Sequence, residues 1–209
     1  MPKPSPEHAV SRREEIIAAC RKLCGTMSYS EITIKEIAEE TSFTRPSIYN
    51  YFETKEEIFL ALFQKEYEIF GADLDELAAR HVTLSTDELA RALAGLLEKR
   101  TLMLKLLSMN LFEMESNSRL ERLVEFKRAY GESISALERC LAKFRPQMSG
   151  DERRSFICAF LPFVYGLYPY TTVTEKQKLA MERAGVCHVD MSTFEMAYSG
   201  IRALLGGLK

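Results

Sequence analysis

The chain has 209 residues, of which 46% are hydrophobic and 28% are charged, and its net charge at pH 7 is −2. This composition is ordinary for a globular protein and excludes a surface coated in basic charge, so any contact with nucleic acid has to be local. No apolar run reaches the roughly 18 residues of a membrane-spanning helix. The five cysteines lack the spacing of a disulfide framework. We therefore expect the protein in the reducing cytoplasm, where disulfides are rare.

Helix starts are marked along the chain by capping boxes, in which a Ser or Thr and a Glu or Gln three residues later satisfy each other's backbone N–H groups. Strand signals are nearly absent, because no stretch keeps a period of two and no Asn-Gly or Asp-Gly turn occurs. The fold class is therefore all-α. The boxes are Ser11/Glu14, Thr33/Glu36, Thr54/Glu57, Ser85/Glu88, Ser118/Glu121, Ser149/Glu152, Thr174/Gln177 and Ser192/Glu195.

About nine helices and three parts are expected. Residues 1–10 lack the apolar middle of a signal peptide and are typical of a flexible arm. Residues 11–55 form a helix-turn-helix domain, and residues 56–209 form a larger helical domain. The expected helices span residues 11–28, 34–41, 45–51, 55–80, 86–115 with a break, 119–145, 150–168, 174–184 and 193–206.

The helix-turn-helix is indicated by apolar spacing over residues 34–48. Ala38 is small where the two helices cross, Phe43 plugs the turn, and Ile48 anchors the second helix from beneath. Thr44 is placed to cap that helix, and Pro46 lies in its first turn, where a missing N–H does no harm. A helix held in this way can project its outward side chains into a major groove.

The run TIKEIAEETSFTRPSIYNYFETKEEIFLALF, residues 33–63, resembles the DNA-binding signature of the TetR family of bacterial transcription regulators. The resemblance rests on Ile37-Ala38, the turn at residues 42–44, residues 49–52 and Lys55, and it is close over about the first 60 residues. Ser42 stands where the family typically has Gly, so we expect a turn there that is slightly strained or differently shaped. Helix-turn-helix geometry alone is found in many proteins and does not by itself indicate DNA binding. The net charge of this region does not indicate it either, since residues 1–60 hold eight Lys and Arg against ten Asp and Glu.

The resemblance implies a role for each outward side chain of this run. Thr44, Tyr49 and Lys55 would contact phosphates, and Arg45, Ser47, Asn50 and Tyr51 would contact base edges. Pro46 offers only an apolar surface, to a thymine methyl. The complete expected DNA-binding set is Lys35, Thr44, Arg45, Pro46, Ser47, Tyr49, Asn50, Tyr51 and Lys55.

Residues 86–170 are rich in Met and aromatic side chains. Each of them alone is typical of a core, but together they suit an adaptable apolar cavity. The resemblance implies that such a cavity binds a small effector, and the absence of charge from this set favours a mainly hydrophobic one. The expected lining is Leu107, Phe112, Phe126, Tyr130, Phe160 and Phe163.

The last helix carries one apolar stripe, made of Phe194, Tyr198, Ile201 and Leu205. We expect this stripe to be a dimer interface, because no further chain follows to cover it. The resemblance implies that this helix and residues 150–168 form a four-helix bundle with a second copy. A homodimer would match a palindromic operator in double-stranded DNA.

An enzyme is not expected, and neither is a metal, a cofactor or a membrane partner. The cluster Cys187, His188 and Asp190 is too compact for a tetrahedral metal site, and no phosphate loop or nucleophile motif is present. The predicted function is that of a repressor released from its operator by a small hydrophobic effector. The alternatives are a protein of the same fold that uses DNA as a scaffold and binds other proteins, or a helical enzyme.

Overall fold

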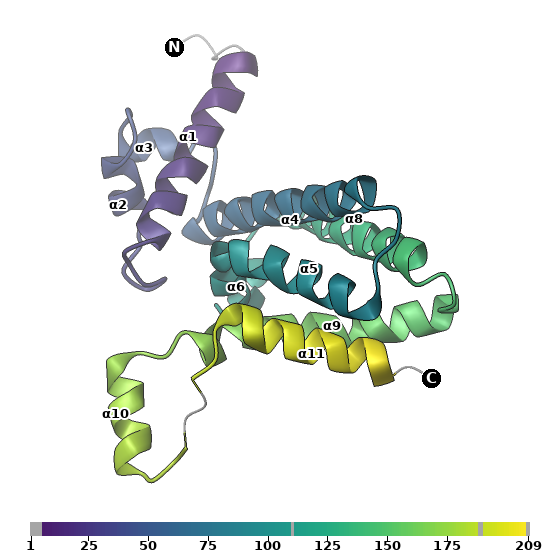
Figure 1. The fold of residues 1–209 in the computed structure, drawn as a ribbon. Helices are drawn as coiled ribbons and strands as arrows, with labels where there is room; N and C mark the ends of the chain where they lie inside the picture. The colour runs from purple at the N-terminus through teal and green to yellow at the C-terminus, as the bar shows by residue number, and fades with distance from the viewer. Residues whose placement is uncertain (1–5, 110, 188–189, 208–209) are drawn as a thin grey trace. The chain divides into compact units, whose positions relative to one another are not determined.

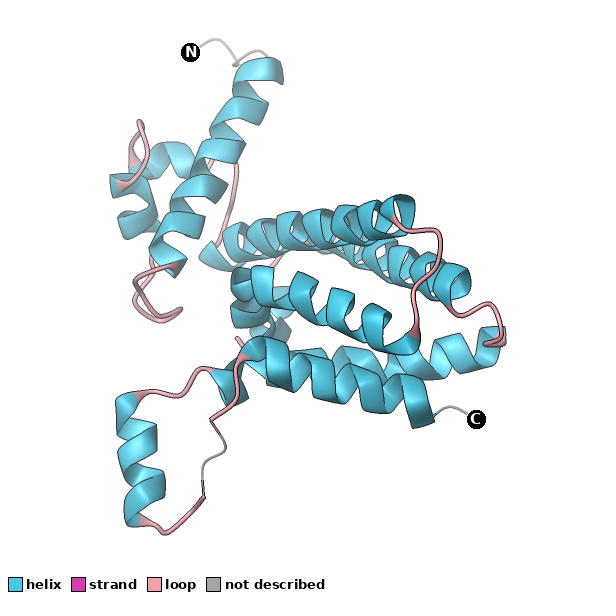
Figure 2. Ribbon diagram, viewed as in Figure 1, coloured by secondary structure: helices cyan, strands magenta, loops and turns pink. Residues whose placement is uncertain are grey.

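The fold is all-α, as the capping pattern predicts. The computed structural model describes residues 6–109, 111–187 and 190–207, and within these ranges it contains eleven helices and no strand (Figures 1 and 2). The helices are α1 (Pro6–Cys24), α2 (Ile34–Glu39), α3 (Arg45–Ile48), α4 (Lys55–Arg80), α5 (Thr86–Lys99), α6 (Thr101–Leu107), α7 (Leu111–Ser116), α8 (Leu120–Phe144), α9 (Gly150–Thr171), α10 (Glu175–Arg183) and α11 (Thr193–Gly207).

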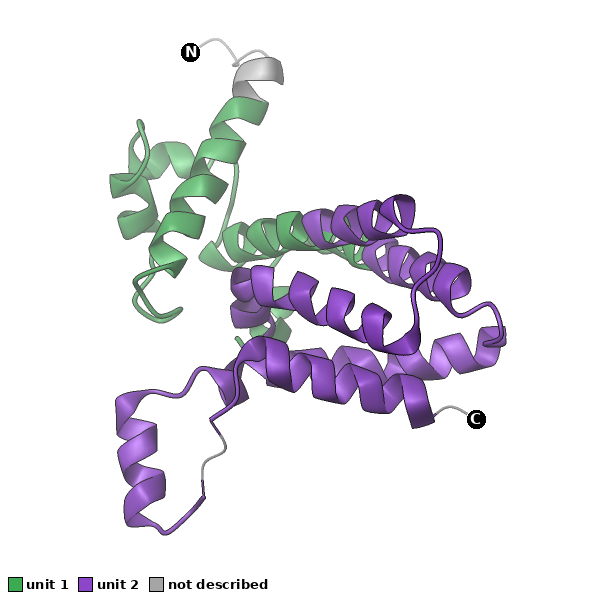
Figure 3. Cartoon of the chain, in the orientation of Figure 1, with its two compact units in different colours: residues 1–67, 109–130 green, residues 68–108, 131–209 purple. Residues whose placement is uncertain are grey.

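Two compact units make up the chain (Figure 3). Unit 1 holds residues 1–67 and 109–130, and unit 2 holds residues 68–108 and 131–209. The long helices α4 and α8 each begin in unit 1 and end in unit 2. No single described helix has the length and apolar composition of a membrane span; α9 and α10 pass that test only as a pair bent by 85°.

The core of unit 1 gathers side chains from α1 to α4 and from α8. Ile16, Cys20 and Ile37 are fully or almost fully buried together with Ile48 and Phe52. Cys20 and Cys24 on α1 are both buried, so they belong to this core. The expected arm at residues 1–10 is partly wrong, because α1 begins at Pro6.

Aromatic rings join α4 to α8 inside unit 1. Phe63 lies 5.3 Å from Phe126 between ring centroids, and Tyr67 lies 5.3 Å from Tyr130. Such tilted and edge-on pairs stabilise a contact beyond the area they bury. They explain why the first half of α8, far from the N-terminus in sequence, belongs to unit 1.

Most of the predicted capping boxes form, completely or in part, at the starts of helices. Ser85, Ser149 and Thr174 make complete reciprocal boxes, and Ser192 and Glu195 exchange both bonds. Thr33 and Thr54 each accept one backbone N–H. Two predicted boxes are wrong: Ser11/Glu14 lies inside α1, and the Ser118 hydroxyl donates to the carbonyl of Met114.

The predicted break within residues 86–115 occurs at two points. Arg100 leaves helical geometry, with φ −104° and ψ 40°, between α5 and α6. Its guanidinium donates to Asp73 at 2.6 Å, which holds the bend against α4 within unit 2. A second interruption separates α6 from α7.

The apolar stripe of α11 is covered by the same chain, and the prediction that it is left open is wrong. Helix α11 packs against α5 and α9 within unit 2. Ile201 is fully buried and Leu205 is 9% exposed. A Cβ atom at Gly200 would lie 2.3 Å from the ring of Phe163, so the small residue is needed where α9 and α11 touch.

Tyr198 and Phe194 complete that contact at the surface of unit 2. The Tyr198 hydroxyl donates to Asp87 of α5, and the Arg91 guanidinium donates back to the Tyr198 oxygen at 3.3 Å. The rings of Phe194 and Tyr198 stack with centroids 6.1 Å apart. The hydrogen bonds from Tyr198 and Arg91 lower the pKa of Asp87.

Candidate nucleic-acid interface

Helix α3 is a short element that is anchored by the residues which follow it. Thr44 occupies the predicted N-cap position with an extended backbone, but its side chain makes no capping hydrogen bond. Pro46 lies in the first turn, as predicted. The chain keeps turning after Ile48, since Tyr51 and Phe52 both donate backbone N–H groups to the Ile48 carbonyl. Ile48 and Phe52 are fully buried. The opposite side of this segment is therefore turned to solvent.

The outward face of α3 presents polar and aromatic groups. Arg45, Pro46 and Asn50 are exposed, and Tyr49 is 44% exposed. The Arg45 guanidinium donates to the Tyr49 hydroxyl at 3.2 Å, and the hydroxyls of Thr44 and Ser47 are 3.2 Å apart. Ser47 and Tyr51 are half-buried. This places the predicted base-contacting and phosphate-contacting residues of α3 on one short segment.

The two lysines of the predicted DNA-binding set, Lys35 and Lys55, differ in how many contacts their ammonium groups already make. Lys35 is exposed on α2 and pairs loosely with Glu39 at 3.6 Å. The Lys55 ammonium donates to the carbonyls of Tyr29 and Ile32, at 3.0 and 3.3 Å, and lies over the Tyr29 ring. Since an ammonium has three N–H donors, one remains for a phosphate. Lys55 therefore also holds the loop between α1 and α2 in place.

The acids near α3 are each bonded to a donor. Glu36 accepts from the Thr33 hydroxyl, Glu40 pairs with Lys22 at 2.5 Å, and Glu56 accepts from Tyr29 at 2.9 Å. Glu53 and Glu57 both pair with Arg119. Burial, followed by the bond to Glu56, raises the pKa of Tyr29. Residues 41–52 carry no acid at all, and Arg45 is their one charged side chain.

The turn between α2 and α3 is not strained, contrary to expectation. No described residue other than glycine has a positive φ, so Ser42 does not need the conformation that would favour Gly. Instead, Glu15 of α1 accepts the backbone N–H of Ser42 at 2.5 Å and its hydroxyl at 3.2 Å. A carboxylate 27 residues earlier in the chain thus supplies the acceptor for the polar groups of Ser42 in this turn.

A buried ion pair fixes the start of α4, immediately after α3, and sequence patterns did not indicate it. Glu57 is 1% exposed, and its two oxygens accept from Arg119 Nε at 2.7 Å and Nη2 at 2.8 Å. The backbone N–H groups of Arg119 and Glu53 also donate to it. The Thr54 hydroxyl donates to the Asn117 carbonyl at 3.1 Å. The segment between α7 and α8 is thereby bonded to the first turn of α4.

Low pH should weaken the ion pair between Glu57 and Arg119. Burial alone would raise the pKa of Glu57, but the hydrogen bonds from Arg119 and from backbone N–H groups outweigh it, and the pKa is lowered from 4.5. A group with a lowered folded pKa stabilises the fold above its unfolded pKa and loses that contribution as pH falls through the folded value. We therefore expect part of the stability of unit 1 to disappear below about pH 4.5.

Urea unfolding followed by circular dichroism between pH 3 and pH 7 measures this effect. Glu57→Gln should be less stable than the parent protein at pH 7, and the gap should narrow towards pH 3. Equal pH dependence in both proteins would show that other carboxylates dominate acid unfolding.

The residues expected to line a ligand cavity are divided between the units. Phe126 and Tyr130 belong to the aromatic contact of unit 1, and Phe112 on α7 is 81% exposed. In unit 2, Phe160 stacks on Phe156 inside α9, Leu107 is buried on α6, and Phe163 touches Gly200. A cavity lined by some of these six residues stays a prediction.

No described group of three His, Cys, Asp or Glu side chains is arranged to hold a metal ion. Of the cluster considered from sequence, His188 lies outside the described residues, and Cys187 and Asp190 are exposed.

Two protein-family descriptions match this chain, one over its N-terminal part and one over the rest. The family described as bacterial regulatory proteins of the tetR family matches residues 16–62, and the tetracyclin repressor-like C-terminal domain matches residues 64–209. An HTH-type transcriptional repressor of Mycobacterium tuberculosis, Rv1474c, is 28% identical over 72 residues, which are 34% of this chain and 38% of that protein. The matched stretch thus spans well under half of the relative's length.

Solved structures of the same fold cover nearly the whole chain. A TetR/AcrR family transcriptional regulator from Thermobifida fusca aligns with a TM-score of 0.62 and 20% identity, covering 95% of this chain and 99% of that one. The regulator FadR of Bacillus subtilis, solved with stearoyl-CoA, aligns with a TM-score of 0.60 and 17% identity, covering 94% and 99%. At these identities the likeness concerns the fold alone.

Proposed function

We propose that this chain, which belongs to the TetR family of bacterial regulatory proteins, binds operator DNA and represses transcription in the cytoplasm. The observation that supports this most directly is the outward face of α3. That face and the turn after it, residues 49–52, carry Arg45, Tyr49 and Asn50 above a buried anchor of Ile48 and Phe52. A helix held from beneath, with base-reading side chains outward and no acid on it, has what a major groove requires.

The contacts divide into two chemical classes. Arg45 is a bidentate donor suited to guanine, and Asn50 is suited to adenine, so these two specify sequence. Lys35, Thr44, Tyr49 and Lys55 fix the position of the helix on the sugar–phosphate backbone. The bond between Arg45 and the Tyr49 hydroxyl orients the guanidinium before DNA arrives, which lowers the entropy lost on binding.

Replacing Arg45 with alanine should relax the sequence preference at one base pair of each half-site, at a cost of about 1–3 kcal/mol per protomer. Lys35→Ala is the matched control, because its ammonium contacts only phosphate in this proposal. That control should weaken binding to operator and unrelated DNA by similar factors and reduce the salt dependence by about one ion. Fragments selected from genomic DNA supply the operator, and gel-shift titrations with base-substituted copies measure the preference. An unchanged preference in Arg45→Ala, with an altered one in Lys35→Ala, would reverse the assigned roles.

The proposed repressor is a homodimer that uses the outer faces of α9 and α11. With the apolar stripe of α11 covered inside the protomer, the free faces carry Cys158 and Pro162 on α9 and Ser199 and Ala203 on α11, all exposed. Small side chains allow helices of two copies to approach closely, and a two-fold dimer presents two α3 helices to a palindromic site.

A small, mainly hydrophobic effector is proposed to release the operator. The support is an apolar pocket of about 750 Å³ within unit 2, a volume in the range of ligand sites. Release requires that the effector binds the DNA-free conformation more tightly than the DNA-bound one, because only differential affinity shifts the equilibrium.

A further inference from the structure

The pocket of unit 2 lies at a place that the aromatic content of the chain did not indicate. It is bounded by the last turn of α9, by one face of α10, by the loop after α10 and by Met196 at the start of α11. None of the six residues expected to line a cavity takes part in it.

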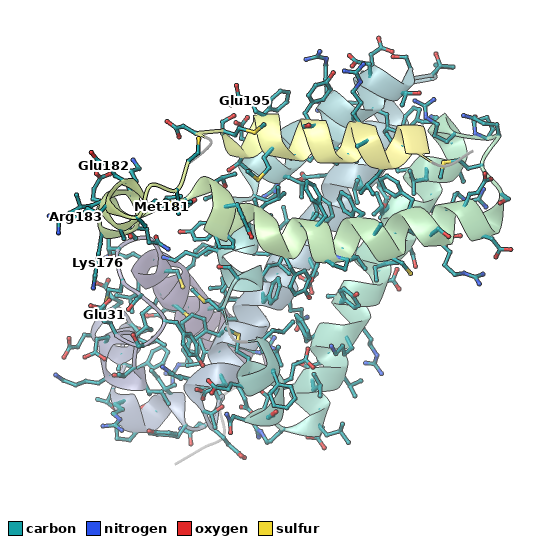
Figure 4. All side chains as sticks on the ribbon, turned by 90° about the horizontal axis from the view of Figure 1, so that it is seen from below. Glu31, Lys176, Met181, Glu182, Arg183 and Glu195 are labelled. Atoms are coloured by element: carbon teal, nitrogen blue, oxygen red, sulfur yellow. The ribbon has the colours of Figure 1, made fainter. Side chains whose placement is uncertain are left out.

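Helix α10 forms one wall of the pocket without packing on the core. None of its residues is buried, and an isolated helix of nine residues is marginal in water. Its ends are specified locally, by the Thr174 capping box and by Gly185 with φ 65°. Figure 4 shows Met181 on the side of α10 turned towards α9, with Glu182 and Arg183 on the other side. An occupant of the pocket would supply the packing that α10 lacks.

The lining is neutral and rich in sulfur. Among the described residues, no Asp, Glu, Lys or Arg side chain lines the pocket, whereas Met181, Cys187, Met191 and Met196 do. The pocket is open to solvent, since Gln177, Ala180 and Cys187 are exposed, but a charged ligand that covered its apolar lining would lose hydration there without gaining a partner of opposite charge. Thioethers are polarisable and pack favourably against aromatic rings. These side chains favour a neutral aromatic body.

Gln177 determines which polar group a ligand of this pocket must carry. Its amide oxygen already accepts from the Thr174 backbone N–H at 2.9 Å and hydroxyl at 2.8 Å, as part of the capping box. The two N–H donors of its amide remain for a ligand, which must therefore offer an acceptor. A smaller polar pocket of about 220 Å³ shares Tyr170, Val173 and Met191 with the large one. Its lining also holds Asp190 and Lys178, and the Lys178 ammonium already pairs with Glu175 at 3.1 Å.

We propose that this pocket binds a neutral aromatic molecule that carries a carbonyl or ether oxygen, with the oxygen bonded to the Gln177 amide and the rings against the methionines. The inference rests on the proposed function in one respect, since it names the class and the site of the effector. Binding orders α10, because the ligand buries the apolar face of that helix.

Nile red tests the site without DNA, because it is a neutral fused aromatic with a carbonyl acceptor and its emission brightens in apolar surroundings. We expect saturable binding of about one dye per chain, weakened at least tenfold in Ala180→Trp, where the indole fills the pocket. Glu182→Trp, on the other side of the same helix, is the matched control and should bind as the parent does. The chain has no native Trp, so each variant holds a single reporter, and position 180 should emit at the shorter wavelength.

Gln177→Glu tests the hydrogen bond to the ligand without changing the volume of the pocket. A carboxylate keeps the oxygen that the capping box needs but removes the amide donors, so Nile red should bind about tenfold more weakly while helix content by circular dichroism is unchanged. Equal dye binding in Ala180→Trp and Glu182→Trp, or full binding in Gln177→Glu, would overturn the proposal. Operator binding is measured separately in gel shifts, so a protein that binds dye at the pocket but never binds DNA would refute the proposed function and leave the ligand site standing.

Discussion

Arg119→Ala should lower the free energy of unfolding by about 3 kcal/mol, because it leaves the Glu57 carboxylate buried without its cation. Glu57 is 1% exposed, whereas the Arg119 side chain is 39% exposed. This asymmetry places the expected loss at the lower end of what broken buried pairs cost, since water reaches the site once the guanidinium is gone. Urea titration at pH 7, followed by circular dichroism, measures the loss.

Arg122→Ala is the control on the same helix. Arg122 pairs with Glu125 three residues later, and both side chains are partly exposed, at 26% and 37%. Such a pair contributes at most about 1 kcal/mol. Similar losses in the two variants would mean that the Glu57 pair behaves as a surface contact. If only Arg119→Ala loses stability, operator affinity should fall with it, because Thr54 and Lys55 leave their places when the first turn of α4 loosens.

Charged substitutions on the two faces of α11 should have opposite consequences. Ile201→Glu places a carboxylate in the fully buried contact with α5 and α9 and should cost about 4 kcal/mol of protomer stability. Ala203→Glu changes an exposed position of the same helix. It should leave the protomer folded but separate the two copies, because two like charges would meet near the two-fold axis of the proposed dimer.

Light scattering gives the mass of each variant, and thermal unfolding gives its stability. A dimeric Ala203→Glu protein would move the interface away from the outer face of α11. A stable, folded Ile201→Glu protein would contradict the burial of that residue inside the protomer.

Local sequence determined the helices and the DNA-binding face. A capping box needs only two residues three positions apart, so the starts at Ser85, Ser149 and Thr174 could be predicted without knowing what the helices pack on. The same holds for α3, whose N-cap residue, early proline and buried Ile48 lie within five positions. Once Ile48 and Phe52 point inward, helical periodicity turns the positions two residues from Ile48, Pro46 and Asn50, to the opposite side, where both are exposed.

Contacts between distant segments were decided only by the tertiary structure. The partners Glu57 and Arg119 are 62 residues apart, and nothing in either local pattern selects the other. The stripe on α11 was correctly identified as apolar, but a stripe does not say whether its own chain or a second copy covers it, and α5, more than a hundred residues earlier, does. The pocket beside α10 is built partly from loops, which have no periodicity to predict from. Periodic patterns report which side of an element is apolar, whereas the identity of its neighbour depends on how the whole chain closes on itself.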